Sequence, residues 1–179
     1  MMAHQNDKQL IERAQSGDER AFEALLLEYY DVMFRIAFKW RRNRADAEDI
    51  TQNACIKLAR NINSFNFRSA FTSWLYRMVI NTAIDWQRQN NRCQAYELTE
   101  NPGHACETDA MENALYAKQV LQQVQTLPGK EKTALLLVMS EGLTHKETAA
   151  IMECKESTVS WYIHEARKKL DKFEERRHG

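Results

Sequence analysis

The chain has 179 residues, of which 44% are hydrophobic, so it can form one domain of ordinary size or two small ones. It contains only 5 Gly and 2 Pro, which disfavours a turn-rich all-β fold. The formal net charge is zero, which excludes a general affinity for polyanions, but the charges are unevenly distributed and local charge matters more than the sum.

Targeting and metal signals are weak. The opening "MMAHQNDKQL" lacks the apolar stretch of a signal peptide, and no run approaches the roughly 18 apolar residues of a membrane span. The cysteines are widely spaced without a C-x-x-C pair, which favours a reduced, cytoplasmic protein. His104 and Cys106 are close in sequence, but two ligands do not make a zinc site. We therefore expect no metal and no cofactor.

The first half of the chain has the periodicity of helices. Apolar residues recur at steps of three and four over residues 22–40, 47–62 and 71–86, and Asp18 is placed to cap the first of these segments. The three segments predict one compact helical domain over residues 7–91.

The pattern lapses over residues 92–109. This segment contains Pro102-Gly103, has a net negative charge and shows no apolar period, so it is predicted to be a flexible linker. Helical periodicity then resumes at about Asp109, which predicts a second domain over residues 110–175. The expected fold is all-α, with two small helical domains joined by a flexible acidic linker.

The segment "LTHKETAAIMECKESTVSWYIHEARKKL" has the pattern of a helix–turn–helix. Thr144 and Glu147 form a capping box, "ECKES" forms the turn, and Glu156 or Ser157 begins the next helix. The side of that helix expected to face the core comprises Val159, Ile163, Ala166 and Leu170.

The opposite side of that helix suits a DNA major groove, because its residues are polar, aromatic and basic. An ordinary αα-hairpin with a solvated face remains the alternative. The outward residues are Ser157, Ser160, Trp161, His164, Arg167 and Lys168.

Three carboxylates, Asp46, Glu48 and Asp49, crowd the start of the second predicted helix. Metal binding is disfavoured, because adjacent helical residues point in different directions and no further ligand is spaced to close the shell. Stabilisation of the helix dipole explains an acidic start, at about 0.3–1 kcal/mol per carboxylate, but not the need for three. Docking to another protein is the preferred interpretation.

Two long segments carry a family resemblance. "LPGKEKTALLLVMSEGLTHKETAAIMECKESTVSWYIHEARKKL" resembles the C-terminal domain of sigma-70-family RNA polymerase sigma factors. "DAEDITQNACIKLARNINSFN" followed by "FTSWLYRMVINTAIDWQRQ" looks like their N-terminal domain. Two such domains with nothing folded between them resemble the layout of the extracytoplasmic-function (ECF) group.

The resemblance implies a transcription initiation factor that binds core RNA polymerase, recognises −35 and −10 promoter elements and helps to melt the start site. It implies docking on a coiled coil of the polymerase's largest subunit and on the flap region, and an anti-sigma factor as a further partner. The residues it assigns to core-polymerase binding are Asp46, Asp49, Gln52 and Asn53.

The same resemblance assigns residues to DNA. A base-capturing loop and the helix after it would bind the −10 strand, because extruded bases are held by stacking and by nearby cations. Trp74 and Trp86 on that helix lie on the apolar stripe and are expected to be core residues. The −10 candidates are Ser64, Phe65, Asn66, Phe67, Arg77, Asn81, Asp85 and Arg88. The −35 candidates are Lys155, Ser157, Thr158, Ser160, Trp161, His164, Arg167 and Lys168.

One position departs from the family pattern, and two other classes of protein are alternatives. Glu153 occupies a turn position that is often Gly in the family. A stand-alone helix–turn–helix regulator would bind duplex DNA without needing the acidic patch. A carboxylate-bridged helical enzyme needs paired Glu-x-x-His motifs, and the chain has none, so catalysis is not expected.

Overall fold

The computed structural model describes residues 2–94 and 111–178, and all regular secondary structure in these ranges is helical. The chain divides into two compact units, Met1–Gln87 and Arg88–Gly179. The expected all-α fold with two helical parts is confirmed. Most of the predicted linker, with His104 and Cys106, lies outside the described residues, so its flexibility stays a prediction.

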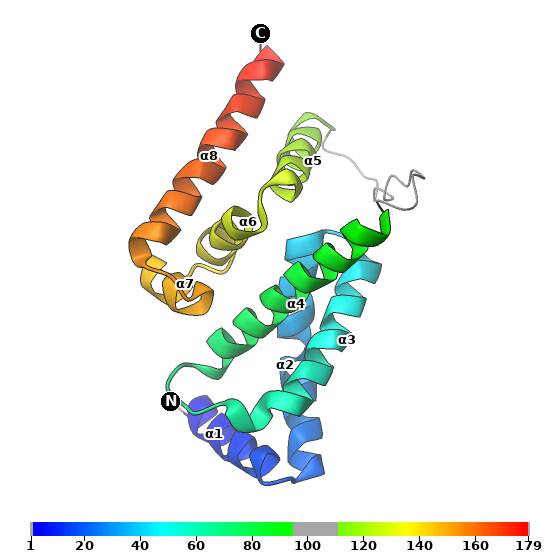
Figure 1. The fold of residues 1–179 in the computed structure, drawn as a ribbon, viewed down its shortest axis with the longest axis vertical. Coiled ribbons are helices and arrows are strands. Elements are labelled where there is room, and N and C mark those ends of the chain that lie inside the picture. Colours follow the sequence, from blue (N-terminus) through cyan, green and yellow to red (C-terminus); the bar gives the residue numbers. More distant parts are fainter. Residues whose placement is uncertain (1, 95–110, 179) are drawn as a thin grey trace. The chain divides into compact units, whose positions relative to one another are not determined.

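The first unit contains one more α-helix than the sequence predicted, and a short 3₁₀ helix (Figure 1). The additional helix, α1 (Met2–Gln15), precedes α2 (Glu19–Arg41), α3 (Arg44–Asn61), the short 3₁₀ helix η1 (Ile62–Ser64) and α4 (Phe71–Gln94). The end of α4 also differs from the prediction, because the helix continues to Gln94 and so includes the first residues of the predicted linker.

Side-chain caps fix the starts of α2 and α3. Asp18 accepts a hydrogen bond from the Ala21 backbone N–H at 3.1 Å, as predicted, and Asn43 caps α3 by accepting from the Asp46 N–H at 3.1 Å. Arg13 donates two hydrogen bonds to Asp18, which lower the pKa of that carboxyl. The turn between α1 and α2 is therefore held by one carboxylate that serves both helices.

The core of the first unit lies where α2, α3 and α4 face one another. These three helices lie alongside one another in Figure 1, and each contributes residues at helical spacing that are almost fully buried. The most deeply buried large side chains are Leu25, Met33, Ile36, Trp40, Ile50, Leu58, Leu75 and Val79. Burying such a side chain stabilises a fold by roughly 1.5–3 kcal/mol, so this shared core sets how the three helices pack.

α1 joins this unit through few apolar side chains. Of its described residues, Ile11 and Ala14 are buried. The hydroxyl of Tyr29 on α2 donates to Asp7 on α1 at 3.0 Å. Burial, and then this hydrogen bond, raise the pKa of Tyr29 above its ordinary value. A helix with so small an apolar face gives little periodic signal, which is why the sequence did not predict it.

The second unit contains α5 (Met111–Thr126), α6 (Gly129–Leu135), α7 (His145–Met152) and α8 (Glu156–His178). α6 continues directly into a π-helical turn, η2 (Leu136–Ser140). None of the described helices in either unit combines the length and apolarity needed to cross a membrane.

The predicted helix–turn–helix is formed by α7 and α8. Thr144 and Glu147 make the predicted capping box, and the two bonds from Thr144 lower the pKa of the Glu147 carboxyl. A small apolar core holds the two helices together. Its buried members are Ala134, Ala149, Val159 and Ile163, with Ala166 also buried and Leu170 half-buried.

The turn of the helix–turn–helix is strained at one residue. Glu153 ends α7 in the left-handed region, with φ 52° and ψ 46°, and its N–H donates to the Ala149 carbonyl. A residue with a Cβ pays about 1 kcal/mol for this conformation, and Gly does not. This explains physically why Gly is common at such a position.

We expect Glu153→Gly to raise the free energy of unfolding by about 0.5–1 kcal/mol, because it relieves the backbone strain. Glu153→Ala is the matched control, since it removes the carboxylate but keeps the Cβ. Urea denaturation of both variants tests this. A stabilisation that is equal in the two would show that the carboxylate, and not the backbone, carries the cost.

Candidate functional site

An open groove of about 360 Å³ lies between α3 with η1 on one side and α4 on the other. Four of the predicted −10 residues line it: Ser64, Arg77, Asn81 and Asp85. The remainder of the lining is Lys57, Asn61, Trp74 and Met78. The groove therefore combines cations, amides and one half-buried indole, which are the groups that hold a nucleotide strand.

Lys57 is a groove residue that the sequence did not indicate. Its Nζ lies 3.1 Å from Oδ2 of Asp85, so the side chains of α3 and α4 form an ion pair within the groove lining. The sequence contains a signal that could have identified Lys57: it stands one helical turn before Asn61, another groove residue, so both lie on the same face of α3. Arg88 is exposed on α4 and is not among the groove residues.

The loop that follows η1 is built around a buried ring. Phe65 is only 5% exposed; its ring packs edge-on against Phe71, with 5.1 Å between ring centroids, and at a tilt against Trp74, with 5.5 Å between centroids. In this conformation its ring is not accessible to a base, contrary to the expectation for a base-capturing side chain. Phe65 instead anchors the loop, because its ring covers the rings of Phe71 and Trp74.

The rest of the loop is exposed. Asn66 accepts a hydrogen bond from the Arg68 N–H at 3.2 Å, which forms a local turn. Phe67 is 39% exposed and has a φ of 59°, an uncommon conformation for a bulky residue. Such strained residues cluster at functional sites, so Phe67 is the aromatic side chain of this loop that is best placed to meet a ligand.

α1 supports this loop. The Gln15 side chain donates to the carbonyl of Ile62 at 2.8 Å and to that of Phe65 at 2.7 Å, so one amide binds both sides of the turn. Lys8 lies over the ring of Phe67, 5.8 Å from its centroid. These contacts join residues about 50 positions apart, and no local pattern in the sequence could have predicted them.

The two tryptophans of α4 are half-buried and are not core residues, contrary to expectation. Trp74 stacks on Phe71 at 5.7 Å and faces the groove. Trp86 carries the Arg41 guanidinium over its ring at 4.8 Å. An apolar stripe at helical spacing did not distinguish these rings from core residues, because an indole also packs well against cations and other rings.

Two of the three carboxylates at the start of α3, those of Asp46 and Glu48, form ion pairs with arginines. Asp46 accepts two hydrogen bonds from Arg41, one of them at 2.8 Å from Nε, and its side chain is 19% exposed. Glu48 pairs with Arg44 at 2.9 Å.

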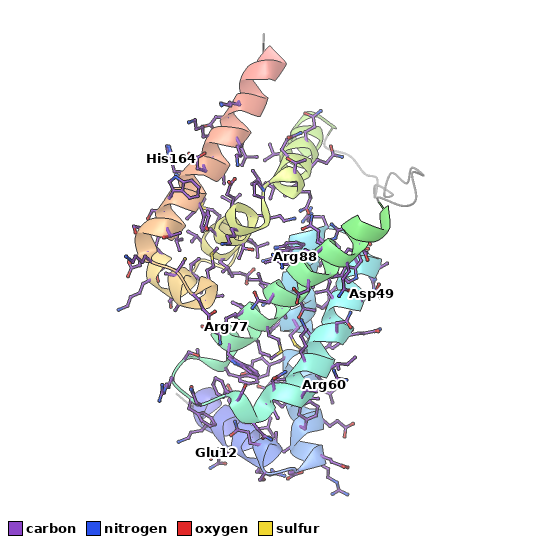
Figure 2. All side chains as sticks on the ribbon, in the orientation of Figure 1. Glu12, Asp49, Arg60, Arg77, Arg88 and His164 are labelled. Atoms are coloured by element: carbon purple, nitrogen blue, oxygen red, sulfur yellow. The ribbon has the colours of Figure 1, made fainter. Side chains whose placement is uncertain are left out.

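The remaining predicted docking residues of α3 are Asp49, Gln52 and Asn53, and all three are exposed. Figure 2 labels Asp49 and Arg60 on α3 and Arg77 and Arg88 on α4. The exposed docking candidates follow one another along α3, whereas Asp46 is part of the packing between helices.

The outward face of α8 is as predicted. Seven of the eight −35 candidates are exposed, among them Trp161 at 54% and His164, which is labelled in Figure 2. Thr158 is half-buried. Ser160 donates to the Glu156 carbonyl at 3.1 Å and contacts Nδ1 of His145 at 2.9 Å, so its hydroxyl already has two partners.

A helix–turn–helix whose second helix exposes Ser, Trp, His and basic side chains fits a DNA-binding protein, and the polar groove of the first unit, with its one indole, adds a surface suited to a single strand. Residues 25–93 match the family described as Sigma-70 region 2, and residues 117–170 match Sigma-70, region 4. The chain belongs to the sigma-70 family of RNA polymerase sigma factors, in its ECF group.

Similar proteins match over nearly their whole length. The RNA polymerase sigma-H factor of Pseudomonas aeruginosa is 33% identical over 184 residues, which cover 96% of this chain and 95% of the relative. The ECF RNA polymerase sigma-E factor of Haemophilus influenzae is 34% identical over 183 residues, covering 95% and 96%. The chain is therefore a transcription initiation factor that directs core RNA polymerase to promoters, and not a stand-alone regulator.

Solved structures share the fold. CnrH, solved in complex with the cytosolic domain of CnrY, has a TM-score of 0.67 at 21% identity, covering 94% of this chain and 97% of that one. The sigma factor RpoE of Bartonella quintana, solved with the anti-sigma factor NepR, has a TM-score of 0.66 at 20% identity, covering 84% and 94%.

We expect Gln15→Ala to lower the free energy of unfolding by about 1–2 kcal/mol, because the Phe65 carbonyl loses the Gln15 amide and the Ile62 carbonyl keeps only the Phe65 N–H. Amide hydrogen exchange should become faster in residues 62–68 by a larger factor than in the core of α2, where it should follow only the loss in global stability. Gln52→Ala is the matched control, an exposed Gln of the same unit. Equal exchange in the loops of both variants would contradict a supporting role for Gln15.

Proposed function

We propose that the groove between α3 and α4, with the loop after η1, binds a melted strand of the −10 element during promoter melting. The observation that carries this proposal is the convergence of Ser64, Arg77, Asn81 and Asp85 on one groove beside a half-buried Trp74. Phe67 would stack on an extruded base, and Phe65 would hold the loop in shape. Arg88 would contact the strand beyond the groove.

The outward face of α8 would bind the −35 element in the major groove. Its N-terminal residues Ser157, Ser160 and Trp161 would contact base edges, and Lys155, Thr158 and His164 would flank them. Arg167 and Lys168 lie further along the helix and would anchor phosphates, because long cationic side chains reach the backbone. A domain over residues 7–91 would bind the −10 element and a domain over residues 110–175 would bind the −35 element. The linker between them would let one chain bind both elements at the same time.

Core polymerase would dock on the exposed residues of α3, namely Asp49, Gln52 and Asn53, and its flap region would meet the second unit. Asp46 would support this surface indirectly, because its ion pair with Arg41 holds the start of α3 in place. The solved relatives CnrH and RpoE were captured with CnrY and NepR, which supports an anti-sigma factor as a further partner. The chain would act in the cytoplasm without a cofactor, a metal or catalysis of its own.

Run-off transcription with purified core polymerase tests the proposal, with a promoter selected from a random library by the reconstituted holoenzyme. Asn81→Ala and Arg77→Gln should lower open-complex formation on duplex promoters. A promoter that is already mismatched over the −10 region should recover much of the Asn81→Ala loss if melting is the affected step. Full activity of both variants on duplex promoters would exclude the groove.

The acidic start of α3 should divide into a docking residue and a structural one. Asp49→Lys should weaken binding to core polymerase roughly tenfold, or about 1.4 kcal/mol, with the melting temperature unchanged. Asp46→Asn should instead lower the free energy of unfolding by about 1.5–3 kcal/mol, because Arg41 loses a charged, half-buried partner. Pull-down titration and urea denaturation separate the two. The opposite assignment of the two losses would contradict our division of the patch.

Base contacts and phosphate contacts on α8 should separate by mutation. Lys168→Ala should weaken binding to all −35 sequences alike and reduce the salt slope by about 0.9, the value of one phosphate of duplex DNA. Trp161→Ala should change sequence preference by roughly 1–3 kcal/mol at single base pairs and leave that slope unchanged.

Selection from a promoter library with each variant gives the measurement. Ile163→Val is the control, because this buried change should cost about 0.5–1.5 kcal/mol of stability without altering sequence choice. Wild-type −35 preference in the Trp161 variant would show that α8 does not recognise the bases.

A further inference from the structure

The positive charge of Lys57 is paired with the carboxylate of Asp85 within the groove. Its Nζ lies 3.1 Å from Asp85 Oδ2, and the two side chains are 40% and 53% exposed. An ion pair this exposed is worth little, so a stronger or more numerous set of anions can replace it. Asp85 itself carries a charge that repels a phosphate, which makes it an unusual residue for the path of a nucleic acid strand.

We propose that Asp85 is an internal competitor of the DNA strand: it holds Lys57 in the free protein, and a strand phosphate takes its place when the groove is occupied. This rests on the proposed −10 function of the groove. Lys57 is then a phosphate-binding residue of that site, and Asp85 sets how easily the cation is released.

The rest of the groove supports this exchange. Lys57 and Asn61 lie on one face of α3, and the Asn61 amide donates to the Lys57 carbonyl at 2.8 Å. Arg77, Asn81 and Asp85 follow one another at four-residue steps along α4, so they face the groove in a row. A strand that runs along this row passes Arg77 and Asn81 and then reaches the ion pair. The released Lys57 can bind its phosphate there, while the displaced Asp85 is exposed enough to be solvated.

The proposal reverses the expected sign of one mutation. If Asp85 only bound DNA, for instance by accepting from a base amino group, Asp85→Asn would weaken binding. If it competes with DNA, Asp85→Asn frees Lys57 and removes a repulsive charge, so binding becomes tighter. The expected gain is roughly two- to fivefold, the factor that corresponds to a surface ion pair.

The test uses the full chain and a fluorescein-labelled, 12-nucleotide single-stranded DNA pool of random sequence, with binding measured by fluorescence anisotropy across a salt series. Asp85→Asn should bind more tightly by that factor. Lys57→Gln should bind roughly two- to fivefold more weakly, with a salt slope flatter by about 0.7, the value of one phosphate of a single strand. In the Lys57→Gln background, Asp85→Asn should lose at least half of its gain.

Asp31→Asn is the matched control, because it removes the same charge from an exposed position of α2 that does not line the groove. It should change binding much less than Asp85→Asn does. Thermal melting of each variant checks that the fold is kept.

Three results would overturn the competitor role: weaker or unchanged binding by Asp85→Asn, a gain that Asp31→Asn equals, or a gain kept in the Lys57→Gln background. Failure of the proposed −10 function has a different signature. Arg77→Gln and Asn81→Ala would then leave the binding of the random pool unchanged, whatever Asp85→Asn does.

Discussion

The first unit depends on one core shared by α2, α3 and α4, and Arg41 closes that core at one end. Its guanidinium lies over Trp86 of α4 and pairs with Asp46 of α3, while its own backbone ends α2. One cation thus contacts side chains of two other helices at the end of its own. The shared core and the contacts of Arg41 together hold α3 and α4 beside each other, and the polar groove lies between these two helices.

The two units present their candidate DNA-binding residues in different ways. In the first unit the residues proposed to bind the melted strand come from two helices and a loop, so their geometry depends on tertiary packing. In the second unit nearly all of the residues proposed to contact duplex DNA lie on the single helix α8, which the capping box of α7 and a small core hold in place. This difference suits the two tasks, since melted strands need a shaped pocket, whereas a duplex groove needs one exposed helical face.

The same difference decides what could be predicted from the sequence. The helix–turn–helix is specified by local chemistry: a Thr–Glu capping box, buried residues at steps of four and three, and an exposed opposite face. The N-caps of α2 and α3 and the helical spacing of their buried residues are specified just as locally. In contrast, the pairing of Asp46 with Arg41, the burial of Phe65 and the Lys57–Asp85 contact depend on which helices meet, and periodicity does not encode that. α1 was missed because its attachment is largely polar.

The attachment of α1 also has a consequence for the order of folding. Gln15 is made early in synthesis, but its two carbonyl partners lie 47 and 50 residues later in the chain. Contacts of such long sequence separation form only after the intervening helices have packed, since closing the loop earlier would cost entropy without reward. We therefore expect the Gln15 contacts to the loop after η1 to be among the last native contacts to form. We also expect them to be among the first to open when the protein unfolds locally, while the core of the unit stays intact.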